Sequence, residues 1–399
     1  MIVRNEAARL EACLASAAPA VDEIVIVDTG STDGTQALAR SAGARVVEWA
    51  WRDDFAAARN QALAAARGSW VLMLDADERL APDAAALIRT LTAAGGADGF
   101  NCQLVSRLPE DQPSPTITHS YCRLFRPLAG VAFEGRVHEQ IAPSIIRAGG
   151  RIAASDITIL HEGYADVSPT KLARNLRLLE CALAERPNDA FVNFNLGLTL
   201  VSAGQWTTAC AAFERALAIT DAPLNAPLRA IAWMKLGEAR MRDGDWHAAG
   251  EAAAAALALE PELALARYAL GRSLFEQGAI DAAGAVFDEL ADAGADALGM
   301  TLHPRVVSVA RALVMIRQRR LAEAAEVLEP VAADDPTGEA SLHLGNVYLA
   351  LGRLGEAADV YRAARAAGIT DAQLERRLEL CTRLAGIASA GLALGGPRA

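Results

Sequence analysis

The stretch VDTGSTDGT, residues 27–35, is made almost entirely of Asp, Gly, Ser and Thr. It begins at the last residue of the short apolar run 24–27, which predicts a buried strand. Polar segments that contain glycine are usually turns. In an α/β sheet, however, ligands bind beyond the carboxyl ends of the strands. The stretch is therefore either a simple turn or a turn that also forms half of a binding site.

Up to about residue 165, short apolar runs alternate with helical patterns, which predicts a mostly parallel, Rossmann-like sheet covered by helices. One helix is marked by apolar residues at positions i, i+3, i+4 and i+7, and Asn5 is suited to cap it. These apolar residues are Leu10, Cys13, Leu14 and Ala17. The predicted strands are 24–27, 45–49, 70–74, 99–105 and 121–125.

From about residue 189 the pattern changes to a repeat of Leu-Gly pairs, each followed by alanine 13 residues after the leucine. The pairs begin at Leu196, Leu236, Leu270 and Leu344, and an aromatic residue follows at Phe213, Phe287 and Tyr361. The pattern resembles the tetratricopeptide repeat, a helix–turn–helix unit of about 34 residues, which implies an all-α solenoid over 189–386. The alternative is an unrelated alanine-rich helical bundle. Residues 166–188 are predicted to be a bridging helix, 371–386 a closing helix and 387–399 a tail.

Composition narrows the classes of function. The formal net charge of −11, with no run of Lys or Arg, argues against nucleic-acid binding. The six cysteines are scattered without a C-x-x-C pair, so neither a disulfide framework nor a zinc site is expected. No apolar run approaches the ~20 residues that span a bilayer, and no signal peptide is visible. A cytoplasmic protein is expected, with peripheral attachment to the inner face of a membrane left open.

Two acidic groups follow two of the predicted strands. Asp75 and Asp77 lie at i and i+2, so both carboxylates can point to one side, where they repel each other unless a cation or proton intervenes. Mg²⁺ or Mn²⁺ bound to a diphosphate would resolve that repulsion. The alternative is a solvated turn that opens the next helix. Asp28 either caps its own turn or accepts hydrogen bonds from a nucleoside. Neither a P-loop nor a G-x-G-x-x-G motif is present.

Five segments in order, MIVRNE, DEIVIVDTGSTDGT, WRDDFAAARNQAL, GSWVLMLDADE and FEGRVHEQI, resemble the family 2 glycosyltransferases with a GT-A fold. The resemblance is closest to the bacterial branch with C-terminal tetratricopeptide repeats. It implies a catalytic domain over 1–165. Members of this family normally carry several apolar residues before the position of MIVRNE. The first strand is therefore expected to be shortened here, or the native start to lie upstream of Met1.

The resemblance implies a site for a nucleotide-sugar, taken to be a UDP-sugar. Asp28 and Thr29 would contact its base and ribose, and Asn5 and Glu6 would line the nucleoside pocket. Arg59 would lie near the donor phosphates; its alternative role is that of an exposed helix arginine.

The resemblance also implies that Asp75 and Asp77 hold the donor diphosphate through Mn²⁺ or Mg²⁺, with Asp77 the direct ligand. The family inverts the anomeric configuration, with a carboxylate as the base that deprotonates the acceptor. Glu139 is the first candidate and Glu134 the second, with His138 as a partner. His161 and Glu162, after the strand-like run 157–160, are a pair that could close over the site, and they are not assigned a role in it.

The expected acceptor is a saccharide, a lipid-linked sugar or a peptide or protein, and the repeats would dock either the acceptor or a partner protein. The transferred group is expected to be a hexose. Two other readings remain: a binding scaffold whose glycosyltransferase-like half is inactive, and a nucleotidyltransferase that makes the sugar nucleotide. The second would need a basic, glycine-rich loop near the N-terminus, which the sequence lacks.

Overall fold

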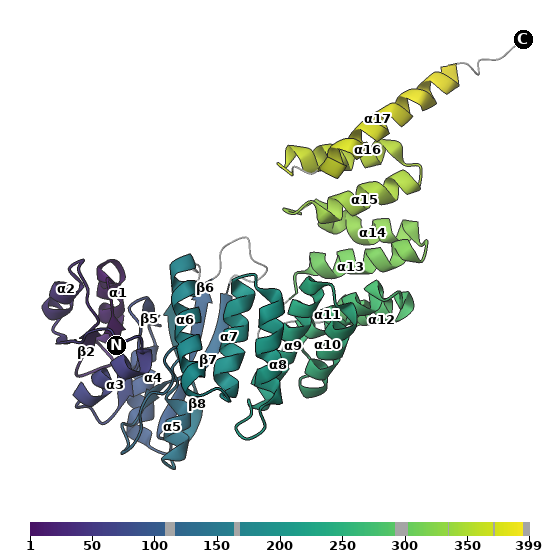
Figure 1. Cartoon of the computed structure of the whole chain (residues 1–399). Helices are drawn as coiled ribbons and strands as arrows, with labels where there is room; N and C mark the ends of the chain where they lie inside the picture. The colour runs from purple at the N-terminus through teal and green to yellow at the C-terminus, as the bar shows by residue number, and fades with distance from the viewer. Residues whose placement is uncertain (108–115, 163–167, 292–301, 334, 370–371, 394–399) are drawn as a thin grey trace, which may run out of the picture. The chain divides into compact units, whose positions relative to one another are not determined.

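The computed structural model describes the chain except for residues 108–115, 163–167, 292–301, 334, 370–371 and 394–399 (Figure 1). The chain divides into two compact units, Met1–Leu224 and Asn225–Ala399. The first unit contains all the strands of the described chain together with the first helices of the repeat region. The catalytic half and the start of the repeats are therefore parts of one compact unit.

The first three strands form the predicted parallel sheet, in the order β1-β2-β3. They are β1 (Ile2–Val3), β2 (Val25–Asp28) and β3 (Arg45–Glu48), connected by α1 (Ala7–Ala17) and α2 (Thr35–Ser41), and α3 (Phe55–Ala65) follows. Helix α1 buries Leu10, Cys13, Leu14 and Ala17, so the predicted apolar face is confirmed. The prediction that Asn5 caps this helix is wrong. Glu6 occupies the N-cap position without a side-chain cap, and Asn5 has a φ of 57°.

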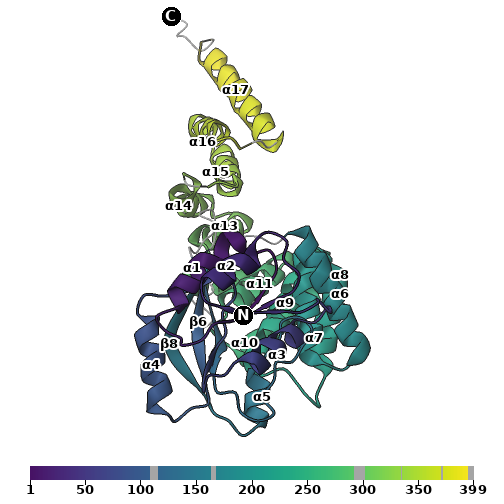
Figure 2. The ribbon, with the colours of Figure 1, turned by 90° about the vertical axis from the view of Figure 1, so that its left-hand side faces the viewer.

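The second sheet is mixed, in the order β4-β7-β6-β8-β5, and only β6 and β8 pair in parallel. Helix α4 packs along β8 (Figure 2). The parallel arrangement expected for the whole domain therefore holds for the first sheet and for one pair of the second. The elements are β4 (Val71–Leu72), β5 (Glu78–Leu80), α4 (Ala84–Ala94), β6 (Gly99–Arg107), β7 (Thr116–Phe125), α5 (Ala142–Arg147) and β8 (Ile152–His161).

A cavity of about 250 Å³ lies between the two sheets, lined on one side by Val25 of β2 and on the other by Val71 and Leu72 of β4. Strand β1 pairs with β2 only at Ile2 and Val3. Among the described strands, none lies beside the first half of β2 on the side that faces β4, and the cavity lies there.

The helical region begins with α6 (Pro169–Glu185), the predicted bridging helix, which is capped by Ser168. Helices α7 (Ala190–Ser202) and α8 (Trp206–Ala218) complete the first unit. None of the described helices is both long and apolar enough to cross a membrane. The second unit contains α9 (Ala226–Asp243), α10 (Trp246–Leu259), α11 (Ala264–Glu276), α12 (Ile280–Ala291), α13 (Pro304–Arg317), α14 (Leu321–Ala332), α15 (Glu339–Ala350), α16 (Leu354–Ala366) and α17 (Ala372–Ala393).

The Leu-Gly pairs have a steric cause. A Cβ atom at Gly271 would lie 2.5 Å from the ring of Phe287, and one at Gly345 would lie 2.4 Å from the ring of Tyr361. Gly197 stands in the same relation to Phe213. These three glycines on the first helix of a pair thus receive the aromatic ring of the second, whereas a Cβ at Gly237 would lie 3.3 Å from the Ala249 carbonyl.

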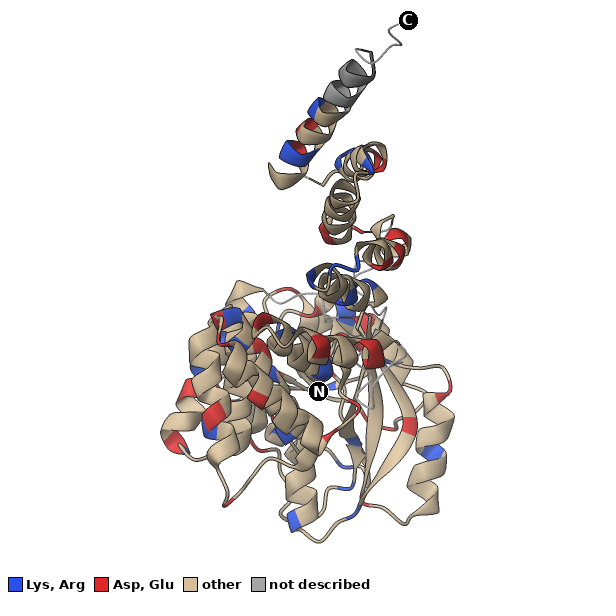
Figure 3. Cartoon of the chain, turned by 90° about the vertical axis from the view of Figure 1, so that its right-hand side faces the viewer, with Lys and Arg blue, Asp and Glu red and all other residues tan. Residues whose placement is uncertain are grey.

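Lys and Arg are interspersed with Asp and Glu along the helices in the view of Figure 3, which agrees with the absence of basic runs in the sequence. Local ion pairs in this region include Arg272–Glu276 and Arg353–Glu356.

Candidate active site

Asp28 ends β2 and is almost fully buried. Its Oδ1 accepts hydrogen bonds from the backbone N–H groups of Gly30 and Ser31, both at 3.0 Å, and from Gln36 Nε2 at 2.9 Å. Burial would raise the pKa of Asp28, but these hydrogen bonds lower it. Its Oδ2 is buried and has no hydrogen-bond partner in the described part of the chain. A buried acceptor without a donor indicates a ligand position.

The loop after β1 is tied to the same turn. Asn5 Oδ1 accepts the backbone N–H of Thr32 at 2.8 Å, and the Asn5 N–H donates to Ser31 Oγ at 2.9 Å. The Glu6 N–H donates to Thr35 Oγ1 at 2.8 Å. The hydroxyl of Thr29 donates to the Val3 carbonyl at 3.0 Å. Asn5, Glu6, Asp28 and Thr29 are thus brought together as predicted, although these bonds are internal and do not identify a ligand.

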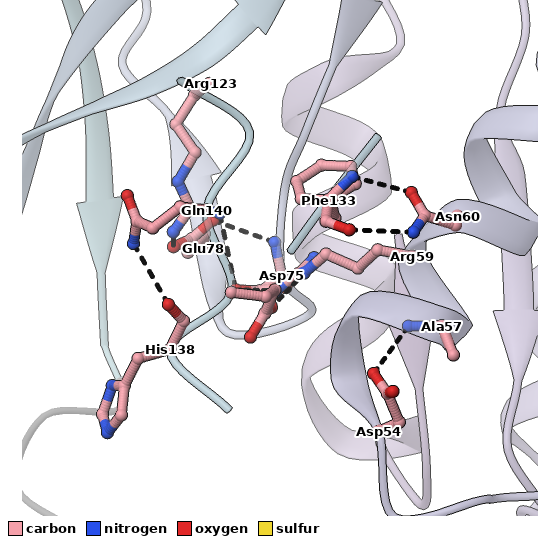
Figure 4. A network of polar contacts seen from close by, with 11 residues as sticks. Asp54, Ala57, Arg59, Asn60, Asp75, Glu78, Arg123, Phe133, His138 and Gln140 are labelled. Atoms are coloured by element: carbon pink, nitrogen blue, oxygen red, sulfur yellow. Dashed lines mark hydrogen bonds and ion pairs between the residues drawn. The ribbon is translucent and has the colours of Figure 1, made fainter. Parts of the chain in front are cut away.

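Arg59, on α3, is buried at the centre of a network of charges (Figure 4). Its Nη2 donates to Asp75 Oδ1 at 2.9 Å and Oδ2 at 3.2 Å, and its Nε donates to Glu139 Oε1. Arg123, on β7, lies 3.5 Å from Asp75 Oδ2 through Nη1 and donates to Glu78 Oε1 at 2.7 Å through Nη2. The alternative in which Arg59 is an exposed helix arginine is therefore wrong.

These arginines neutralise Asp75. Burial alone would raise the pKa of Asp75, but the charges of Arg59 and then Arg123 lower it well below its usual range. Burial also raises the pKa of neighbouring Glu78, to about 7, with the charge of Asp75 as the next cause. Both carboxylate oxygens of Asp75 already face guanidinium groups, so Asp75 is not free to act as the main ligand of a cation.

Asp77 has a different environment. Its side chain is 24% exposed, and its Oδ2 lies 3.4 Å from Nε2 of His161 at the end of β8. The other ring nitrogen of His161 lies 3.0 Å from Ser106 Oγ. Burial would raise the pKa of Asp77, but the hydrogen bond and charge of His161 lower it; the same hydrogen bond raises the pKa of His161. Asp77 therefore remains an accessible, ionised carboxylate with an imidazole beside it.

The donor set suits a divalent cation held jointly by protein and ligand. The described residues contain no group of three or more His, Cys, Asp or Glu side chains that could hold a metal by themselves. Asp77 and His161 offer one carboxylate and one imidazole. Mg²⁺ is commonly bound through one or two carboxylates and completed by substrate phosphates, and Mn²⁺ accepts the same oxygen ligands. The residues present therefore fit a cation that arrives with a diphosphate.

The structure separates the three residues considered for the base. Glu139 joins the network through Arg59, and its side chain is 10% exposed. Glu134 instead forms an ion pair with Arg147 of α5, with its side chain 40% exposed. His138 has a φ of 55°, and its ring points away from Asp75 in Figure 4. Of the three, only Glu139 shares a hydrogen-bond partner, Arg59, with Asp75.

Sequence reasoning did not find Arg123, and it named His161 only as a residue that could close over the site. Both come from strands that reach the site only through the pairing of the second sheet. His161 had a usable signal, because it directly follows a strand-like run, as Asp28 and Asp75 do. Arg123 lies inside its strand and had none.

Comparisons with known proteins give matches for both the N-terminal α/β region and the helical region of the chain. Residues 1–142 match the model of glycosyl transferase family 2, and residues 194–258, 234–297 and 309–372 match a tetratricopeptide repeat model. A TPR repeat-containing protein of Synechococcus elongatus is 38% identical over 51% of this chain and 52% of its own length. An uncharacterized glycosyltransferase of Rickettsia bellii is 34% identical over 25% of this chain and 34% of its own length.

The crystal structure of PilW, a type IV pilus biogenesis factor, is 19% identical, with a TM-score of 0.43 over 51% of this chain and 89% of that chain. The chain spans about half the length of the Synechococcus relative and about a third of the Rickettsia relative. Residues 1–142 thus match family 2 glycosyl transferases, and the matches to tetratricopeptide repeats follow them along the chain.

Proposed function

We propose that this chain is an inverting, metal-dependent glycosyltransferase that transfers a hexose from a nucleotide-sugar to an acceptor. The observation that carries the proposal is the division of roles between Asp75 and Asp77. Two arginines neutralise Asp75, whereas Asp77 stays accessible next to His161. This arrangement is what a cation and a diphosphate require, and both aspartates lie in the segment that matches family 2 glycosyl transferases.

Uracil is the proposed base of the donor nucleotide. The buried Oδ2 of Asp28 needs a hydrogen-bond donor, and the N3–H of uracil and the hydroxyls of ribose are such donors. Asn5, Glu6 and Thr29 hold the turn that carries Asp28, which keeps this acceptor in place. We therefore assign the nucleoside to the carboxyl end of β2 and the diphosphate to the end of β4, beside Asp77.

Glu139 is the proposed base. Its carboxylate accepts the proton of the acceptor nucleophile as that atom bonds to the anomeric carbon, and the bond from this carbon to the phosphate oxygen breaks with inversion. Arg59 holds one oxygen of Glu139, which leaves the other to receive the proton. A bound cation would supply positive charge to the departing nucleoside diphosphate. Asp77, with His161 as second donor, would hold that cation.

The acceptor is proposed to be a saccharide, a lipid-linked sugar or a peptide or protein. The repeats are proposed to dock this acceptor or a partner protein, because stacked repeats form extended concave surfaces.

Calorimetric titration of UDP into the full chain, with and without Mn²⁺, tests the proposal. We expect binding that requires Mn²⁺ and is lost in Asp77→Ala. Asp22→Ala is a matched control, because this aspartate has a side chain 92% exposed and lies near Arg89 instead of the cluster. Parallel titrations with GDP, CDP and dTDP test the base. If the wild-type chain bound none of these nucleotides, the scaffold with an inactive domain would replace the enzyme.

A further inference from the structure

Helix α6 is fastened to the two segments that carry Arg59 and Glu139. Arg177 of α6 donates to both carboxylate oxygens of Asp53, at 2.8 and 2.6 Å, just before α3 begins. Arg136, in the loop that leads to Glu139, donates to the Asp53 carbonyl at 3.2 Å and also forms an ion pair with Glu185 at the end of α6. The bridging helix α6 is therefore held against the start of α3 and the loop before Glu139.

Arg174 lies one turn before Arg177 on the same face of α6, because residues three apart are neighbours on a helix. Its guanidinium carbon lies 5.0 Å from the centre of the Phe55 ring, at the start of α3. Its hydrogen bonds within the described chain go only to Asn175 Oδ1, at 3.3 and 3.1 Å, and no described carboxylate forms an ion pair with it. Burial lowers the pKa of Arg174, and the charge of Glu139 opposes this shift.

The described site is strongly acidic without α6. A diphosphate that entered it would be repelled by the carboxylates unless further positive charge were available. One divalent cation at Asp77 offsets part of this charge. The carboxylates are Glu6, Asp28, Asp75, Asp77, Glu78 and Glu139, and the buried guanidinium groups that face them are those of Arg59 and Arg123.

We propose that Arg174 binds the diphosphate of the nucleotide-sugar donor. The inference rests on the proposed function and extends it to a residue outside the matched family 2 segment. The planar guanidinium of Arg174 can donate two parallel hydrogen bonds to phosphate oxygens while it remains stacked on Phe55. The bridging helix α6 would therefore contribute a donor-binding group.

The test is calorimetric titration of UDP and of uridine, with Mn²⁺ present, into the full chain and into three variants. Arg174→Gln should weaken UDP binding about 10- to 100-fold, because a charged hydrogen-bond partner is lost, and should leave uridine binding unchanged. Arg174→Lys should recover part of the affinity. Arg186→Gln removes the same charge from the other end of α6, where Arg186 pairs with Asp189, and should bind UDP like the wild type. Thermal unfolding of each variant is measured alongside.

Equal UDP affinity of Arg174→Gln and the wild type would overturn the role of Arg174 and leave the proposed function standing. Equal weakening of UDP and uridine binding would also overturn it, since the lost group would not act on the diphosphate. A wild-type chain that binds no nucleoside diphosphate would overturn the proposed function and this inference together.

Discussion

Replacing Asp75 and Asp77 one at a time should separate fold stability from ligand binding. Asp75→Asn removes the carboxylate that both Arg59 and Arg123 face. Removing one partner of a buried ion pair costs about 3–5 kcal/mol. Each arginine keeps a second carboxylate, Glu139 or Glu78, and Asp75 is 31% exposed. We therefore expect a loss nearer to about 2–3 kcal/mol in local stability.

Asp77→Asn should behave in the opposite way. Its partner is His161 at 3.4 Å, and a partly exposed pair of this kind contributes about 0–1 kcal/mol. The variant should remain as stable as the wild type and lose Mn²⁺-dependent UDP binding. The chain has two compact units, so a single unfolding midpoint would mix their stabilities.

Native-state hydrogen exchange of peptides that cover β4 and β7 measures the local stability directly. A loss of about 2–3 kcal/mol corresponds to exchange faster by roughly 30- to 150-fold in Asp75→Asn. Asp77→Asn should exchange at the wild-type rate. Similar exchange in the two variants would refute the division of roles between the two aspartates, and so would wild-type UDP binding by Asp77→Asn.

Three further predictions follow from the same contacts. Glu139→Gln should bind UDP and Mn²⁺ normally and lower kcat by about 10²- to 10⁴-fold, measured by sugar transfer or donor hydrolysis; unchanged turnover would place the base elsewhere. Asp28→Asn should weaken UDP binding about tenfold by calorimetry without changing its dependence on Mn²⁺, because the unpaired Oδ2 is replaced by a donor. Gly345→Ala should cost about 1–3 kcal/mol by overpacking against Tyr361. Gly355→Ala, with open space around it, should unfold no earlier than the wild type in a thermal melt.

The parts of the fold that depend on local pattern were predictable. The face of α1 and the strand before Asp28 follow from hydrophobic spacing, and the Leu-Gly repeat follows from close helix packing. The second sheet was not predictable in its pairing. Long-range contacts determine which strands of this sheet pair and whether they run parallel or antiparallel. A short window of sequence does not contain these contacts.

In the candidate site too, some residues could be predicted from the sequence and others needed the structure. Asp28, Asp75 and Asp77 follow apolar runs and could be found from the sequence. The choice of Glu139 over Glu134 needed the structure, because only the fold shows that Arg59 faces one and Arg147 the other. From the sequence, Asn5 was expected to cap a helix, but its side chain accepts a hydrogen bond from the turn at Thr32. Asparagine suits both helix caps and turns, so the sequence alone could not tell the two roles apart.

Asp75 and Asp77 are two residues apart, so their carboxylates repel each other. The register in which β4 pairs with β7 offsets part of this repulsion. Strand β4 pairs with β7 so that Leu72 lies opposite Leu124, and the Met73 N–H donates to the Arg123 carbonyl at 2.7 Å. This pairing sets Arg123 beside Asp75. A slip of one residue would turn the arginine to the other face of the sheet and leave Asp75 with Arg59 as its remaining guanidinium partner. The pairing of an unremarkable strand therefore decides which aspartate is held by the protein and which is left for a ligand.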